Sequence, residues 1–91
     1  MRVAVTGATG RMGRTVLDVA AERGDEVAFA VNRDAGGETV AGVAVEDAGD
    51  FDALLAAESP DAVVDFTGPS ATVAYARACA DASVPLVTGT T

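Results

Sequence analysis

Short β-rich runs alternate along this chain with stretches of helical periodicity, and this alternation restricts the folds open to it. We expect strands at 2–6, 26–31, 43–45, 62–66 and 86–88, and helices at 11–23, 51–57 and 70–82. Strand, helix and strand in succession form a parallel pair with the helix across one face. The pattern therefore predicts an α/β fold, a Rossmann-like doubly wound parallel sheet in three layers. Ninety-one residues allow one such domain, spanning residues 1–91.

A glycine-rich turn separates the first expected strand from the first expected helix. Its glycines, Gly7, Gly10 and Gly13, follow the spacing G-x-x-G-x-x-G. We assign Gly7 to a tight turn, Gly10 to the close approach of a diphosphate, and Gly13 to packing of the helix on the strand. Because the free N–H groups at the start of a helix bind anions, the turn predicts a dinucleotide-binding site. It lacks the lysine of a P-loop, which disfavours ATP hydrolysis.

Local signals also predict how the helices begin, end and pack. The residues expected to form the buried stripe of the first helix are Met12, Val16, Val19 and Ala20. Gly24 is expected to end that helix, and Asp50 to cap the second one. The polar segment 32–42 is expected to be a loop.

Asn32 and Arg33 follow the second expected strand, where an acidic residue would bind the ribose hydroxyls of the adenosine. Asn32 does not repel a 2′-phosphate, and Arg33 offers it a charge-assisted fork. We therefore expect NADPH as the preferred cofactor and NADH as the alternative. The competing interpretation is a solvated Arg33 that pairs with Asp34 or Glu38.

Charge argues against a nucleic-acid partner. Fourteen acidic residues against six basic ones give a net charge of −8, so the chain as a whole repels a phosphate backbone. The acids are scattered and all the basic residues are arginines, a bias that resembles halophilic proteins. Arg11 and Arg14 nevertheless place positive charge at the glycine turn.

Several other classes of site and location are disfavoured. Without histidine, and with Cys79 as the one cysteine, the chain has no His-based zinc set, general base or triad. We therefore assign neither a metal site nor a catalytic residue. No apolar run reaches the ~18–20 residues of a membrane span. The chain starts directly in a strand-like run without a signal peptide, so we expect a cytoplasmic location.

Three segments resemble the family of 4-hydroxy-tetrahydrodipicolinate reductases, also called dihydrodipicolinate reductases. They are VAVTGATGRMGR at 3–14, VVDFT at 63–67 and GTT at 89–91, and the resemblance covers the whole chain. It implies an NAD(P)H-dependent oxidoreductase of the diaminopimelate route to lysine, which transfers a hydride to an imine-like carbon of a small cyclic dicarboxylate. It also implies that the full-length protein is a homotetramer.

The resemblance assigns residues to the cofactor. These are Gly7, Ala8, Thr9, Gly10, Arg11, Met12, Arg33, Phe66, Thr67, Gly89, Thr90 and Thr91. The first six would hold the diphosphate, the arginine at 33 would lie at the adenosine ribose, and the last five would border the nicotinamide. The family's catalytic histidine and lysine motif belongs to a later domain. The chain stops at Thr91 without a closing helix, so we expect a fragment of a two-domain protein that is inactive alone.

Other interpretations remain open at this point. The chain could be an NADP-sensing regulatory protein, or a CoA-binding Rossmann module without catalysis. Tyr75 lacks the lysine of a Tyr-x-x-x-Lys pair, since Cys79 stands four residues later, so we interpret both as core residues. Asp65, at a strand end, is interpreted as a structural cap rather than a base.

Overall fold

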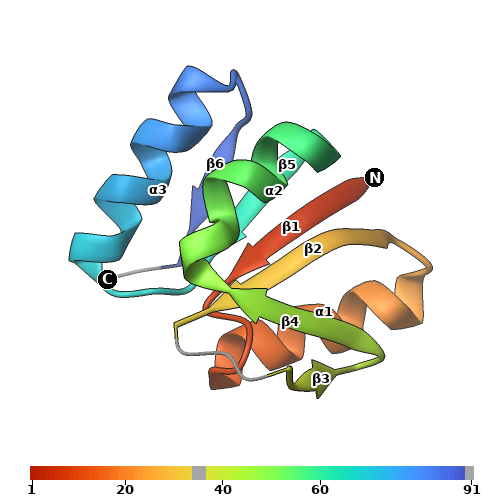
Figure 1. The fold of residues 1–91 in the computed structure, drawn as a ribbon. Coiled ribbons are helices and arrows are strands. Elements are labelled where there is room, and N and C mark those ends of the chain that lie inside the picture. Colours follow the sequence, from red (N-terminus) through yellow and green to blue (C-terminus); the bar gives the residue numbers. More distant parts are fainter. Residues whose placement is uncertain (34–36, 90–91) are drawn as a thin grey trace.

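The computed structural model of this chain describes residues 1–33 and 37–89, apart from the side chain of Pro69. Its strands are β1 (Arg2–Thr6), β2 (Glu26–Asn32), β3 (Thr39–Val40), β4 (Val43–Asp47), β5 (Ala62–Asp65) and β6 (Leu86–Thr88). Its helices are α1 (Arg11–Arg23), the short 3-10 helix η1 (Ala48–Asp50), α2 (Phe51–Glu58) and α3 (Pro69–Asp81). Strands and helices alternate as predicted, and the sheet lies between two helical layers (Figure 1).

The described strands form one sheet in the order β3-β4-β2-β1-β5-β6. The strands β4, β2, β1, β5 and β6 run parallel, and β3 pairs antiparallel with β4. The chain moves outward from β1 to β2 and β4, then returns to the other side of β1 to add β5 and β6. This reversal of strand order is the topological switch point, at which ligands bind beyond the carboxyl ends of the strands. The predicted Rossmann-like α/β fold is confirmed.

Two hydrophobic clusters cover the two faces of the sheet. Successive residues of a strand point to opposite faces, so Ala4 belongs to the cluster beneath α2 and α3, whereas Val5 belongs to the one beneath α1. Phe51 of α2 contacts Phe29 of β2 edge to face, with ring centroids 5.8 Å apart. The helices are therefore held by burial of apolar surface on both sides of the sheet.

The buried stripe of α1 differs from the prediction by a rotation of the helix. Gly13, Leu17 and Ala20 are buried, whereas Met12 and Val19 are 54% and 44% exposed. The reason is Gly13, which packs directly against the backbone of the glycine turn and so determines which face of the helix meets the sheet. Met12 and Val19 were therefore wrong as core residues, while Ala20 is confirmed.

Two further details differ from the sequence interpretation. The expected loop at 32–42 contains β3, whose Val40 is buried and pairs with β4. Asp50 occupies the N-cap position of α2, but its side chain makes no capping hydrogen bond; Asp47 instead accepts one from the Gly49 N–H at 2.7 Å. Gly24 ends α1 with a positive φ, as predicted. Within the described residues, no helix is long and apolar enough to cross a membrane.

Candidate functional site

The glycine turn is pressed between α1 and the segment that follows β5. Gly7 has a φ of 69°, and a Cβ there would lie 2.8 Å from the Phe66 carbonyl oxygen. A Cβ on Gly13 would lie 2.3 Å from the Gly7 carbonyl oxygen. Both glycines are thus required by the fold itself, as predicted. Gly10 differs, because its Cβ would meet only the Gly7 oxygen, at 3.4 Å.

At the start of α1, the N–H groups of residues 11–13 precede the first helical hydrogen bond. The Ala8 N–H donates to the Val31 carbonyl at 3.2 Å, and the Gly10 N–H donates to Gly7 at 3.1 Å. The first helical bond runs from the Arg14 N–H to Gly10. Within the described residues no side chain caps this helix, and its first turn has no acidic residue. An uncapped helix start with positive neighbours is suited to an anion.

A cleft of about 320 Å³ lies beside this turn, beyond the carboxyl ends of β1, β2 and β5. Five of the residues predicted for the cofactor line it, namely Gly7, Gly10, Arg33, Phe66 and Thr67. The tertiary structure therefore brings three segments far apart in the sequence to one hollow. Its volume lies at the lower end of the ~300–1,000 Å³ typical of ligand pockets.

The other predicted residues lie around the cleft rather than along it. Ala8 is fully buried beneath the turn, and the Thr9 carbonyl accepts a hydrogen bond from Arg14 Nε at 2.8 Å. Arg11 and Met12 are exposed at the start of α1. Gly89 lies against Phe66, since a Cβ on Gly89 would be 2.6 Å from Cε1 of that ring. Thr90 and Thr91 lie outside the described residues.

Sequence reasoning missed four residues that line the cleft, Ala48, Gly68, Ala71 and Tyr75. Tyr75 is half-buried and packs edge to face on Phe51, with centroids 4.6 Å apart. The core interpretation of Tyr75 is therefore confirmed, but incomplete. The sequence carried one signal for two of these residues. Ala71 and Tyr75 are four residues apart, so they lie on the same face of a helix and can line the same cleft. Burial raises the pKa of the Tyr75 hydroxyl, the Asp65 carboxylate adds to this, and Arg33 opposes it.

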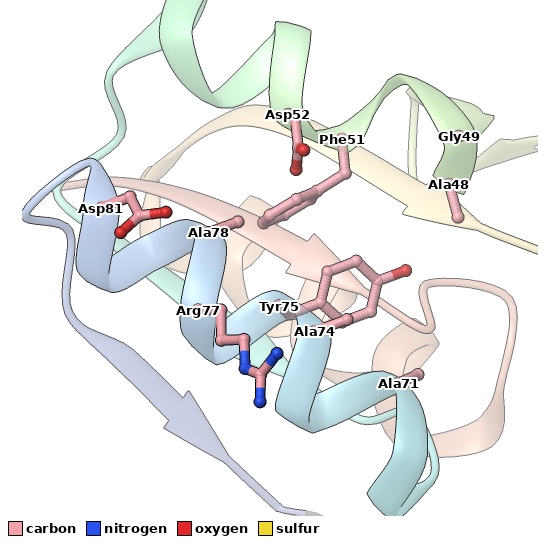
Figure 2. Close-up of a pocket in the computed structure, with 10 residues that line it drawn as sticks. All are labelled: Ala48, Gly49, Phe51, Asp52, Ala71, Ala74, Tyr75, Arg77, Ala78 and Asp81. Carbon is pink, nitrogen blue, oxygen red and sulfur yellow. The ribbon is translucent and has the colours of Figure 1, made fainter.

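A second cleft, of about 540 Å³, lies between η1 and α2 on one side and α3 on the other. Figure 2 shows the ring of Phe51, from α2, lying close to the ring of Tyr75, from α3, at this cleft. Ala48, Ala71 and Tyr75 line both clefts. The hollow beside the glycine turn therefore borders directly on the space between α2 and α3.

The surroundings of Arg33 test the alternative that this arginine pairs with Asp34 or Glu38 instead of binding a phosphate. Arg33 is exposed at the rim, and Asn32 donates a side-chain hydrogen bond to its carbonyl at 3.2 Å. Glu38, one of the expected partners, lies instead 3.6 Å from Arg14 Nη2. The other expected partner, Asp34, lies outside the described residues. The Arg33–Glu38 pair is thus not formed.

Asp65 lies fully buried beneath the cleft, at the end of β5. Its carboxylate accepts hydrogen bonds from several threonine hydroxyls and from the Thr67 N–H at 3.3 Å. Burial raises the pKa of this carboxyl, but the hydroxyl hydrogen bonds together bring it below the ordinary value. The structure therefore confirms the interpretation of Asp65 as a structural acceptor.

Comparison with known proteins agrees with this geometry. A family model described as "Dihydrodipicolinate reductase, N-terminus" matches residues 1–91. The chain belongs to the dihydrodipicolinate reductase family. A 4-hydroxy-tetrahydrodipicolinate reductase of Natronomonas pharaonis is 42% identical, over 100% of this chain and 35% of the relative. The one of Halorhodospira halophila is 44% identical, over 98% and 36%. The chain thus spans about a third of the length of these reductases.

Solved structures share the fold. Aspartate semialdehyde dehydrogenase II of Vibrio cholerae, complexed with ASA, superposes with a TM-score of 0.80 at 28% identity, over 99% of this chain and 30% of that one. RSP, a Rex-family repressor solved with β-NADH, gives 0.82 at 13% identity, over 98% and 45%. At that identity the repressor shows the fold alone.

Proposed function

We propose that this chain is the NADP(H)-binding part of a dihydrodipicolinate reductase and that it prefers NADPH to NADH. The observation that carries the proposal is the uncapped start of α1, which meets a glycine turn at the switch point of the sheet. The match to the dihydrodipicolinate reductase family supports a nicotinamide dinucleotide as the cofactor. The cytoplasmic location and the homotetramer remain predictions.

The residues present fit a dinucleotide. The amides at the start of α1 would hold the diphosphate, and the absence of a side chain at Gly10 leaves room for its approach. Arg33, exposed at the end of β2, would pair with the 2′-phosphate. Phe66, Thr67 and the segment from Gly89 to Thr91 would border the nicotinamide.

In the whole protein, we propose, the bound nicotinamide supplies a hydride to an imine-like carbon of a small cyclic dicarboxylate on the route to lysine. This chain orients the cofactor for that step. It has no histidine or lysine to donate a proton to the substrate. Turnover is therefore expected only when the remainder of a full-length reductase is present, and the 91-residue chain alone should be inactive.

Arg33→Ala tests the cofactor preference. We expect the variant to bind NADPH about 5–150-fold more weakly, because a charge-assisted hydrogen bond of about 1–3 kcal/mol is lost. NADH, which lacks the 2′-phosphate, should bind as before. Fluorescence titration at matched salt measures both constants. Arg23→Ala serves as the control, because Arg23 is an exposed arginine at the far end of α1.

The same titration can overturn the proposal. Equal affinities of the unaltered chain for NADPH and NADH, or an unchanged NADPH affinity in Arg33→Ala, would remove the assignment of that arginine. Tighter binding of coenzyme A than of either nucleotide would favour the CoA-binding alternative.

We propose that the excess of acidic residues is an adaptation to high salt. The stability of the chain should then depend on the salt concentration. The net charge of −8 comes from scattered carboxylates that repel one another. Raising the ionic strength shortens the Debye length from about 30 Å at about 0.01 M to about 3 Å at about 1 M. Thermal melts across this range should show a Tm that rises with salt. A flat or falling Tm would contradict the adaptation.

A further inference from the structure

One buried carboxylate connects four elements of the fold at the base of the cleft. Oδ1 of Asp65 accepts hydrogen bonds from the hydroxyls of Thr6 on β1 and of Thr67 after β5, the latter at 2.6 Å. Oδ2 accepts from the hydroxyls of Thr72 on α3 at 2.6 Å and of Thr88 on β6 at 3.0 Å. The two oxygens thus join β1 to the β5–α3 turn, and α3 to β6.

An ionised carboxylate is the acceptor that this arrangement requires. A hydroxyl has one proton to donate, so each threonine that donates to Asp65 has its rotor directed toward the carboxylate. Hydrogen bonds to an ionised acceptor are shorter and stronger than neutral ones, and a fully buried group is not satisfied by water. Asp65 is therefore an acceptor that the four threonine hydroxyls share, and the Thr72 hydroxyl also lies 3.1 Å from the Gly68 carbonyl oxygen.

The segments held by Asp65 are those that border the far end of the cleft. Thr67 follows Phe66, and both line the cleft. Thr88 precedes Gly89, whose N–H donates to the Asp65 carbonyl at 2.9 Å. Gly89 in turn lies against the Phe66 ring. The β5–α3 turn and the end of β6 thus rest on the main chain and side chain of the same residue.

We propose that Asp65 is a positioning residue, which preforms the nicotinamide end of the cofactor cleft through Thr67, Thr72 and Thr88. The inference rests on the proposed function, because it takes this end of the cleft to receive the nicotinamide. Asp65 lies below the surface of the cleft and would not touch the cofactor itself. We expect Asp65 to raise the fraction of molecules in which the β5–α3 turn and the end of β6 already have the arrangement that binds the nicotinamide.

The two ends of the cofactor should respond differently to loss of this carboxylate. The diphosphate and the 2′-phosphate are assigned to the start of α1 and to Arg33. The Asp65 carboxylate contacts that side through the Thr6 hydroxyl, which lies on a strand that β2 and β5 hold from both sides. When a binding-competent arrangement is only partly populated, the apparent affinity falls by that fraction. A ligand that lacks the nicotinamide should not be subject to this loss.

Asp65→Asn is the first test, because it keeps the shape of the side chain but replaces one acceptor oxygen by a donor. The 91-residue variant is titrated with NADPH and with 2′-phospho-ADP-ribose, which lacks the nicotinamide. We expect NADPH to bind about tenfold more weakly, while 2′-phospho-ADP-ribose keeps its affinity within about twofold. The fluorescence of the bound nicotinamide should also fall toward that of the free cofactor.

Thr88→Val provides a test that does not depend on the folding of Asp65→Asn. It removes one hydroxyl at the nicotinamide side and keeps the carboxylate, so a smaller loss of about threefold for NADPH alone is expected. Thr15→Val is the matched control, because the Thr15 hydroxyl donates to the Arg11 carbonyl at 3.0 Å on α1.

Each outcome decides the inference. Selective loss of NADPH affinity in Thr88→Val, with or without a folded Asp65→Asn, supports it. Equal weakening of both ligands would show that Asp65 only stabilises the fold, and no change in either would show that it positions nothing; both overturn the inference while the proposed function stands. Failure of the unaltered chain to bind NADPH at all would overturn the proposed function and the inference with it.

Discussion

Gly13→Ala is expected to destabilise the chain severely, with a Tm lower by roughly 8–16 °C. The new Cβ would lie 2.3 Å from the Gly7 carbonyl oxygen and 2.8 Å from the Ala8 Cα, both backbone atoms. Alanine gains about 1 kcal/mol over glycine in a helix, whereas overpacking against atoms that cannot move away costs about 3 kcal/mol. The net result is a loss of about 2 kcal/mol in the free energy of unfolding. A thermal melt followed by circular dichroism measures the change.

Gly10→Ala is the matched control for this loss of stability. The same substitution three residues earlier meets one backbone atom at 3.4 Å, an ordinary contact. Its melting temperature should stay close to that of the unaltered chain. If Gly13→Ala melted as late as Gly10→Ala, α1 would not be pressed against the glycine turn as described.

Gly10→Val is expected to lower NADPH affinity by about a hundredfold or more, about 2.7 kcal/mol, while the chain stays folded. Gly10 has a φ of −75° and a ψ of 168°, an extended conformation that valine adopts readily. The fold therefore accepts the side chain. Its methyl groups would occupy the space where the diphosphate is proposed to approach the start of α1.

The measurement for Gly10→Val combines circular dichroism with fluorescence titration on one sample. Gly10→Ala should give an intermediate loss of affinity, because it adds one carbon rather than three. A folded Gly10→Val with unaltered affinity for NADPH would show that the turn serves only the fold. This result would also remove the main support for the proposed cofactor site.

Much of the fold followed from patterns that are local in the sequence. The bounds of β1 and α1 were predicted correctly because a β-branched run, a glycine turn and a helical periodicity follow one another within 24 residues. The roles of Gly7 and Gly13 followed from their spacing between that strand and that helix. The family was also predicted from three short motifs, because their residues keep a characteristic order along the chain.

The tertiary structure alone decided which residues share the site and how they are held. The face of α1 that is buried depends on the contact of Gly13 with the turn, and Tyr75 reaches the cleft because α3 packs beside η1. Thr6 and Asp65 are 59 residues apart in the sequence, yet their side chains are hydrogen-bonded. Periodicity and spacing describe a residue's neighbours along one element. Contacts between elements depend on strand order and packing, which arise only when the whole sheet has formed.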